Sequence, residues 1–307
     1  MSKSKVTRRD ALKVLGAAGA GAAVGTMPSA MAQQAAGANG GGFYRFKVGD
    51  ITLTVLSDGQ SPPGNAFPNW GATPGKQAEF EAALRENFLD GARFVNNFNP
   101  MLVENGNNKI LIDTGRGGTG GQLVANLARA GVTPAQINTV FITHGHGDHI
   151  GGLVTNNAPT FANARHVMGE AEMQFWLSQA TPPANLNALK DRFTLIRAGS
   201  EIAPGLTAVD TAGHTVGHLA VQIASGGQTL WHLGDAGGHH ILSFRFPDHF
   251  LGFDANPQNA VATRARLWQA AAADRIAVVG YHFPWPAVGN VKRSGSAFEF
   301  VPAFFTF

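Results

Sequence analysis

The segment Thr143-His144-Gly145-His146-Gly147-Asp148-His149-Ile150-Gly151-Gly152 is the most informative stretch of this sequence. Three imidazoles and a carboxylate fall within six residues, directly after the apolar run 139–143. Burying four such groups unpaired is costly, whereas a cation satisfies them together. Imidazole and carboxylate are ligands that zinc and similar divalent metals accept. The segment therefore predicts a metal site at the end of a strand, in preference to a solvated His-rich loop.

The sequence around this segment alternates short apolar runs with amphipathic ones. Apolar and polar residues alternate at 43–48 and 51–57, on either side of Gly49 and Asp50, which predicts a β-hairpin. Short strand-like runs at 109–113, 139–143, 206–211, 219–224 and 229–233 predict further strands. Helical spacing predicts helices at 122–130, 170–178 and 260–274. The range 60–75 contains four prolines and is expected to form a loop over the site. Together these patterns predict one mixed α/β domain.

Composition excludes several classes of protein. The chain has 44% hydrophobic and 14% charged residues, which indicates a globular fold, and it contains no Cys, which rules out thiolate metal sites and disulfides. The net charge is +3, but five of the 23 basic residues and only one acid lie in the first 32 residues. The remaining 18 basic and 19 acidic residues are scattered, so a nucleic acid partner is not expected.

The first 32 residues have the pattern of an export signal. Arg8 and Arg9 precede a weakly apolar Ala/Gly stretch, which ends in the A-x-A pattern of Ala30 and Ala32. The segment resembles a twin-arginine signal, and it is too poor in strongly apolar residues to predict a stable membrane anchor. We therefore expect a signal at 1–32, a flexible lead-in at 33–42 and a catalytic domain at 43–307. The expected partner for export is the twin-arginine machinery, and the expected location is periplasmic or secreted.

Further motifs follow in an order that identifies a family resemblance. They are Leu111-Ile-Asp113-Thr-Gly115, Gly213-His214-Thr215-Val216-Gly217-His218, Leu233-Gly234-Asp235 and Tyr281-His282. With the HGHGDH segment, these motifs resemble the signature of the metallo-β-lactamase superfamily, from about residue 43 to residue 307. The resemblance implies an αββα sandwich, in which two mixed β-sheets are flanked by helices.

The resemblance also implies a ligand set for two divalent metal ions, with zinc expected. His144, His146 and His214 would hold one metal, while Asp148, His149 and His282 would hold the other, and Asp235 would bridge them. Asp148 and Asp235 would thus be catalytic as well as ligands, because a hydroxide shared by the metals would attack an ester-type bond. Asp113 would orient a ligand histidine.

Finer similarities favour one branch of the superfamily. Residues 43–45, 170–179 and 298–302 resemble the exported methyl parathion hydrolase-like enzymes, in which an aromatic pocket receives the leaving group. Trp176 matches a member of that pocket, although helix packing would explain it as well. The expected substrate is therefore a small phosphotriester or aryl ester.

Two alternatives remain open at this stage. A lactonase acting on acyl-homoserine lactones would use nearly the same attack, with Tyr281, Phe283 and the C-terminal aromatics lining an acyl groove. The second alternative is a metal-binding module without turnover. Surface aromatic residues are compatible with a homodimer.

Overall fold

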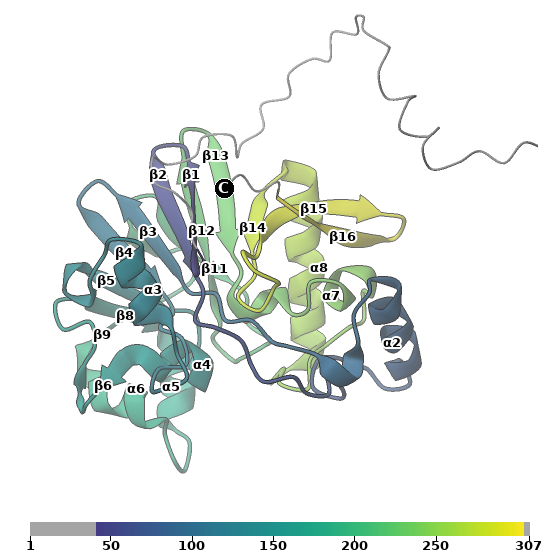
Figure 1. Cartoon of the computed structure of the whole chain (residues 1–307), viewed down its shortest axis with the longest axis horizontal. Helices are drawn as coiled ribbons and strands as arrows, with labels where there is room; N and C mark the ends of the chain where they lie inside the picture. Colours follow the sequence, from purple (N-terminus) through teal and green to yellow (C-terminus); the bar gives the residue numbers. More distant parts are fainter. Residues whose placement is uncertain (1–40, 304–307) are drawn as a thin grey trace, which may run out of the picture. The chain divides into compact units, whose positions relative to one another are not determined.

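Two seven-stranded β-sheets form the centre of this computed structural model, which describes residues 41–303 (Figure 1). The first sheet has the order β1 (Phe43–Val48), β2 (Ile51–Leu56), β3 (Met101–Asn105), β4 (Asn108–Ile112), β5 (Thr139–Ile142), β8 (Arg165–Gly169) and β9 (Phe193–Ile196). Strands β1 to β4 pair antiparallel, whereas β4, β5, β8 and β9 run parallel.

The second sheet is mostly antiparallel. Its order is β10 (Glu201–Ala203), β11 (Leu206–Asp210), β12 (Leu219–Ser225), β13 (Gln228–His232), β14 (Ala277–Val279), β15 (Val288–Ser294) and β16 (Ala297–Pro302). Only β13 and β14 pair parallel within it. A separate small hairpin joins β6 (Val154–Thr155) to β7 (Ala158–Pro159).

Alternation along the strands sorts apolar side chains between two cores. In β4, Ile110 and Ile112 join the cluster shared by the two sheets, whereas Leu111 joins the cluster under the outer helices. A period of two in a strand necessarily sends neighbours to opposite faces. The first sheet is therefore buried on both faces.

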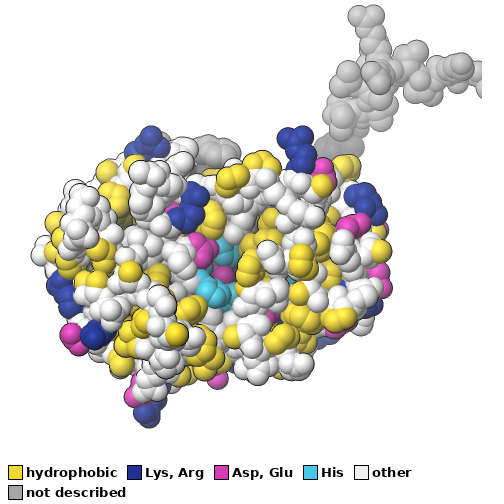
Figure 2. Space-filling model, turned by 90° about the horizontal axis from the view of Figure 1, so that it is seen from below, with side chains coloured by type: hydrophobic (Ala, Val, Ile, Leu, Met, Phe, Trp, Pro, Cys, Tyr) yellow, Lys and Arg dark blue, Asp and Glu magenta, His cyan; other side chains and the backbone are white. Residues whose placement is uncertain are grey.

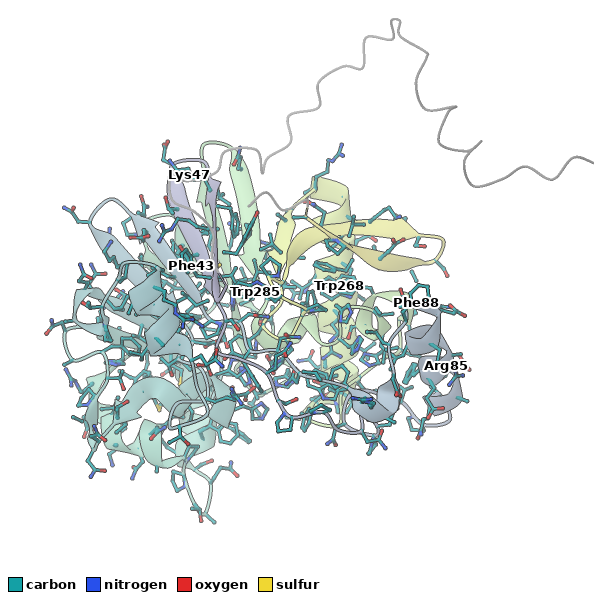
Figure 3. All side chains as sticks on the ribbon, in the orientation of Figure 1. Phe43, Lys47, Arg85, Phe88, Trp268 and Trp285 are labelled. Atoms are coloured by element: carbon teal, nitrogen blue, oxygen red, sulfur yellow. The ribbon has the colours of Figure 1, made fainter. Side chains whose placement is uncertain are left out.

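Helices cover the outer faces of the sheets. The first sheet carries α3 (Leu123–Arg129), α4 (Gly147–Ile150), α5 (Glu170–Leu177) and α6 (Ala184–Leu189), and the second carries α7 (Leu242–Arg245) and α8 (Pro257–Asp274). Trp268 of α8 stacks on Phe244 of α7 and lies within the core (Figure 3). The arrangement confirms the expected αββα sandwich.

The remaining helical segments are short or peripheral. Helix α2 (Gln77–Glu86) contributes to a third cluster, and Phe88 just beyond it is 98% exposed (Figure 3). The 3-10 turns are η2 (Gly91–Arg93), η3 (Pro134–Gln136), η4 (Gly151–Leu153), η5 (Lys190–Arg192) and η6 (Gly234–Gly237). Within residues 41–303, no helix is both long and apolar enough to cross a membrane. The expected export signal at 1–32 and almost all of the expected lead-in at 33–42 lie outside the described residues.

The topology brings the polar motifs to one edge of the sandwich. In each sheet, two neighbouring parallel strands end where motif residues begin: β4 and β5 in the first sheet, and β13 and β14 in the second. Because parallel strands end at the same edge of a sheet, side chains that follow them lie close together. This edge holds the site described below.

Candidate metal centre

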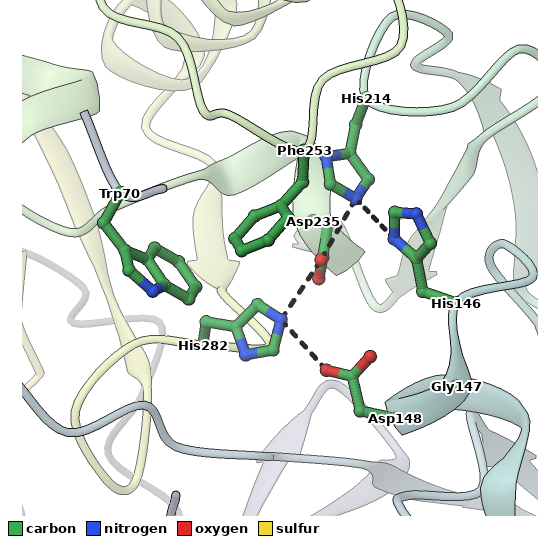
Figure 4. A pocket seen from close by; sticks show the side chains of 8 residues that line it. All are labelled: Trp70, His146, Gly147, Asp148, His214, Asp235, Phe253 and His282. Atoms are coloured by element: carbon green, nitrogen blue, oxygen red, sulfur yellow. Dashed lines mark hydrogen bonds and ion pairs between the residues drawn. The ribbon is translucent and has the colours of Figure 1, made fainter. Parts of the chain in front are cut away.

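The residues that follow β5 provide the largest part of the site. His144 and His146 lie in the turn after the fully buried strand, and Asp148 and His149 occupy the first turns of α4. His214 comes from the β11–β12 connection, Asp235 from η6 after β13, and His282 from the segment after β14. Elements distant in sequence thus bring the predicted ligands close together. Figure 4 shows His146, Asp148, His214, Asp235 and His282 around one pocket.

Four side chains form the first group of ligand atoms. His144, His146, His214 and Asp235 each present one atom within 4.8 Å of the others. The His146 Nδ1 lies 2.9 Å from His144 Nε2 and 3.1 Å from His214 Nε2. The Asp235 Oδ2 lies 3.2 Å from His214 Nε2.

Three side chains form the second group, and Asp235 lies between the two. Asp148, His149 and His282 also present atoms within 4.8 Å of one another. The Asp235 Oδ1 lies 3.1 Å from His149 Nε2, and its Oδ2 lies 3.1 Å from His282 Nε2. One carboxylate therefore faces both groups.

Hydrogen bonds to the far side of each ring direct a free nitrogen into the site. His149 Nδ1 lies 2.8 Å from Asp113 Oδ2, and His282 Nδ1 lies 2.8 Å from the Asn97 carbonyl oxygen. Because Nδ1 carries the proton and donates it in a hydrogen bond to these acceptors, each Nε2 keeps its lone pair. Asp113 thus contacts the side of the His149 ring that faces away from the site, and its expected role in orienting a metal ligand stays a prediction.

The imidazoles of His144 and His214 are also oriented by hydrogen bonds at Nδ1, which leave Nε2 facing the site. The Thr143 hydroxyl lies 3.1 Å from His144 Nδ1 and donates to Asp113 Oδ2 at 2.9 Å. His214 Nδ1 donates to Asp254 Oδ1 at 2.9 Å, and Asp254 is paired with the buried Arg264. Arg264 and His214 hold the pKa of the Asp254 carboxyl at about 2, although burial alone would raise it.

The charges and the burial of the site shift the pKa values of neighbouring histidines in opposite directions. Burial and the His214 imidazole lower the pKa of His146 to about 4, whereas Asp235 and Asp254 outweigh burial and raise the pKa of His214 to about 9. His149 Nε2 and Asp235 Oδ1 are buried without a hydrogen-bond partner. The ring nitrogens and carboxylate oxygens of the site converge, and two of these buried atoms have no hydrogen-bond partner. This arrangement fits a pair of divalent cations, which would satisfy all of these atoms together.

A cavity of about 270 Å³ opens onto the two groups. It is lined by His146, Gly147, Asp148, His214, Asp235 and His282, together with Trp70 and Phe253 (Figure 4). Figure 2 shows histidine and acidic side chains in a hollow with hydrophobic side chains beside it. The Trp70 ring contacts His282 edge to face with centroids 5.3 Å apart, and Phe253 is 44% exposed.

Of the aromatic residues expected near the substrate, those that the structure describes do not line the cavity. Trp176 packs edge to face on His146 with centroids 5.5 Å apart, but it is not among the residues that line the cavity. Tyr281 and Phe283 are fully buried, so the expected acyl groove along them is wrong. The Tyr281 hydroxyl donates to the Asp148 carbonyl oxygen at 2.6 Å instead. Phe304, Phe305 and Phe307 lie outside the described residues.

Four residues that shape the site were not predicted from the sequence. Trp70 belongs to the Pro-rich range 60–75, where a loop over the site was expected but no side chain was singled out. Phe253, Asp254 and Arg264 carry no local motif. His218, at the end of the same motif as His214, contacts the site through its backbone neighbour: its Nε2 accepts from the Asp235 backbone N–H at 3.1 Å.

Comparison with known proteins agrees with this geometry. The family model of the metallo-beta-lactamase superfamily matches residues 96–280, more than half of the chain. Among solved structures, AidC, a dizinc quorum-quenching lactonase in complex with a product, is 27% identical, with a TM-score of 0.80 over 87% of this chain and 99% of its own. The hydrolase AbOPH is 26% identical, with a TM-score of 0.77 and the same coverage of both chains.

A third structure supports the fold alone. A probable metal-dependent hydrolase from Staphylococcus aureus is 21% identical, with a TM-score of 0.70 over 84% of this chain and 100% of its own. None of these comparisons distinguishes the methyl parathion hydrolase-like branch from its relatives. The motifs, the sandwich and the matched family model together establish that this chain belongs to the metallo-beta-lactamase superfamily.

Proposed function

We propose that this protein is a hydrolase that holds two divalent metal ions, with zinc the expected metal, and cleaves an ester-type bond in a small molecule. The observation that carries the proposal is the position of Asp235 between the two groups of ligand atoms. His144, His146 and His214 would hold one cation, and Asp148, His149 and His282 the other. When bound, such a pair activates water at neutral pH and polarises the oxygen of the scissile bond.

The side chains of this chain supply positioning and charge. Asp235 places one carboxylate oxygen toward His149 and the other toward His214 and His282, so it fixes the spacing of the two groups. Asp113 and Asp254 hold His149 and His214 in the orientation that exposes Nε2. Asp148 is 26% exposed at its side chain and faces the cavity, where it can accept a proton during turnover.

The cavity walls indicate the class of substrate. Trp70 and Phe253 offer aromatic surface beside the ligands, and no Lys or Arg is among the lining residues of the described chain. An apolar wall without a Lys or Arg side chain favours an uncharged group such as an aryl or acyl chain. A neutral phosphotriester or an aryl ester meets this requirement.

A lactone is the second candidate substrate. It is favoured by the similarity to AidC, a lactonase, over almost the whole length of both chains. A cyclic ester with an acyl substituent is also neutral, and its ring opening needs the same attack on an ester carbonyl. The cavity alone does not separate it from an acyclic ester.

Parallel rate measurements test the proposal. The purified protein, loaded with zinc, is assayed on an aryl phosphotriester, an aryl acetate and an N-acyl-homoserine lactone, with metal-free protein as the control. We expect turnover of at least one substrate, lost on chelation and restored by metal. Two bound metals with no hydrolysis of any of the three would contradict the proposed substrate class, and absence of metal binding would contradict the metal centre.

We also propose that the protein is exported through the twin-arginine pathway. The support is the paired Arg8 and Arg9 ahead of the Ala/Gly stretch and the A-x-A pattern. In a bacterium with this pathway, the wild-type chain should appear in the periplasm or medium with Gln33 as its first residue. The double substitution Arg8→Lys with Arg9→Lys should leave the uncleaved chain in the cytoplasm, as N-terminal sequencing of each fraction would show.

A further inference from the structure

Glu172 is a fully buried carboxylate outside the ligand set. It lies on α5, and each of its oxygens accepts two hydrogen bonds. Oε1 accepts from the Gly145 backbone N–H at 3.0 Å and from the Trp176 indole N–H at 2.5 Å. Oε2 accepts from the Thr215 hydroxyl and the Gly217 backbone N–H, both at 2.8 Å. Four donors match the four lone-pair positions of an ionised carboxylate.

Three of the four donors belong to the two loops that carry His144, His146 and His214, and the fourth, Trp176, lies on α5 itself. Gly145 lies between His144 and His146, and Thr215 directly follows His214. These loops come from different sheets, and their imidazoles meet where His146 Nδ1 lies 3.1 Å from His214 Nε2. Glu172 therefore joins, from behind, the two segments whose side chains converge in the site.

Close packing shows that both loops lie directly against α5. A methyl group added at Gly145 would overlap the Trp176 indole, and one added at Gly217 would overlap the Glu172 backbone. Glycine at these positions lets the loop backbones approach the helix closely enough to donate. The same glycines leave both loops free to adopt other conformations unless something holds them.

We propose that Glu172 is a positioning residue that fixes the relative placement of His146 and His214 for one of the two cations. This inference rests on the proposed metal centre. Charge-assisted hydrogen bonds from both loops to a single buried carboxylate set the distance between the loops. Trp176 donates its indole N–H to the Glu172 carboxylate and packs its ring on His146, which differs from a role in the substrate pocket.

Glu172→Gln is the informative variant because it keeps the size of the side chain. Its amide nitrogen must face either the Gly145 and Trp176 N–H groups or the Gly217 N–H group, so at least one donor meets another donor. Glu170→Gln is the matched control on the same helix. Glu170 is 35% exposed at its side chain and pairs with Arg197, which is 81% exposed.

The experiment measures zinc dissociation constants of the metal-free proteins with a competing chelator, together with the absorption spectra of their Co²⁺ forms. In Glu172→Gln we expect the affinity for one of the two cations to fall by about 10–100-fold, which is the usual effect of losing a group that orients ligands. The Co²⁺ spectrum of that site should change, and the affinity for the other cation should stay near wild type. Glu170→Gln should match the wild-type protein in both measurements.

Unchanged constants and spectrum in Glu172→Gln would overturn the inference, whatever happens to its unfolding midpoint. If that variant does not fold, Thr215→Val decides the question, because it removes one donor and preserves the shape of the side chain. Weaker binding of one cation in Thr215→Val supports the inference, and wild-type binding overturns it. Absence of tight binding in the wild-type protein would instead contradict the proposed metal centre, and this inference with it.

Discussion

Asp235 differs from the other proposed ligands because each of its carboxylate oxygens faces different histidines. Its Oδ1 faces His149 and its Oδ2 faces His214 and His282, so removal of one oxygen affects both groups at once. The neighbouring imidazoles of His282 and His149 hold the pKa of this carboxyl well below its usual range, although burial opposes them. The carboxyl is therefore suited to bind cations as an anion.

Asp235→Asn should lower kcat for the preferred ester by at least about a hundredfold, because electrostatic stabilisation by the cations contributes several kcal/mol. The variant should also retain fewer than two metals after dialysis, as elemental analysis would show. Asp248→Asn, at an exposed position away from the cavity, is the control and should behave as the wild type. Full activity in the Asp235→Asn protein would remove Asp235 from the mechanism.

Trp70 offers the second prediction at the level of single residues. Its ring lines the cavity beside His282, where it can hold an aryl or acyl group against the site. Trp70→Ala should raise KM by about tenfold, since losing one aromatic contact costs roughly 1–2 kcal/mol, with a smaller change in kcat. Phe88→Ala, 98% exposed and outside the cavity lining, serves as the control. An unchanged KM in Trp70→Ala would mean that the substrate binds elsewhere.

Among the secondary structure elements, α8 has a role in the site as well as in the core. Its Arg264 pairs with Asp254, with Nη2 2.9 Å from Oδ2, and Asp254 accepts from His214. Both partners are buried, so removing one leaves an uncompensated charge. The helix therefore supports His214 from outside the sheet.

Arg264→Met should destabilise the protein by about 3–5 kcal/mol, which is the usual cost of breaking a buried ion pair from one side. Urea unfolding of the metal-free protein measures this change. Arg266→Gln, two positions along the helix and exposed, should change the free energy of unfolding by less than about 0.5 kcal/mol. Equal midpoints for Arg264→Met and the wild type would show that the pair is not needed.

Sequence patterns predicted the elements next to the motifs well. The expected hairpin of 43–48 and 51–57 is β1 and β2, and the expected strands at 109–113 and 139–143 are β4 and β5 within one residue at each end. Strands β4 and β5 are buried on both faces and therefore appear in the sequence as short continuous apolar runs. The helix expected at 260–274 begins earlier, at Pro257, because Asn256 caps it by accepting from the Asn259 N–H.

Residues positioned by long-range packing could not be predicted in this way. Trp70 and Phe253 reach the cavity from separate loops, and their rings meet with centroids 5.9 Å apart. No local pattern encodes that approach, since it depends on how the loops rest on the third hydrophobic cluster. The proposed ligands could be named from the sequence because each sits in a motif near a strand end, whereas the residues of the cavity walls follow no such spacing.

At the scale of the whole molecule, we expect buried histidines to contribute to the loss of stability in acid. Burial is the largest cause of a lowered pKa at eight of the eleven histidines. His166 in β8 is buried and belongs to neither group of ligand atoms. Burial, assisted by Arg192, lowers its pKa to about 4. It therefore isolates the effect of one buried neutral imidazole.

The sign of that effect follows from the protons bound in each state. Between its folded pKa of about 4 and its ordinary value of 6.5, His166 binds a proton in the unfolded chain but not in the folded protein. Stability is thus fully present above the ordinary value and falls as the pH drops through this window. His166→Leu removes the titrating group, so the variant should lose less stability on acidification than the wild type, by about 1 kcal/mol per pH unit. Urea unfolding of both metal-free proteins at about pH 7 and about pH 5 measures the difference, and parallel slopes would show that His166 does not contribute to acid lability.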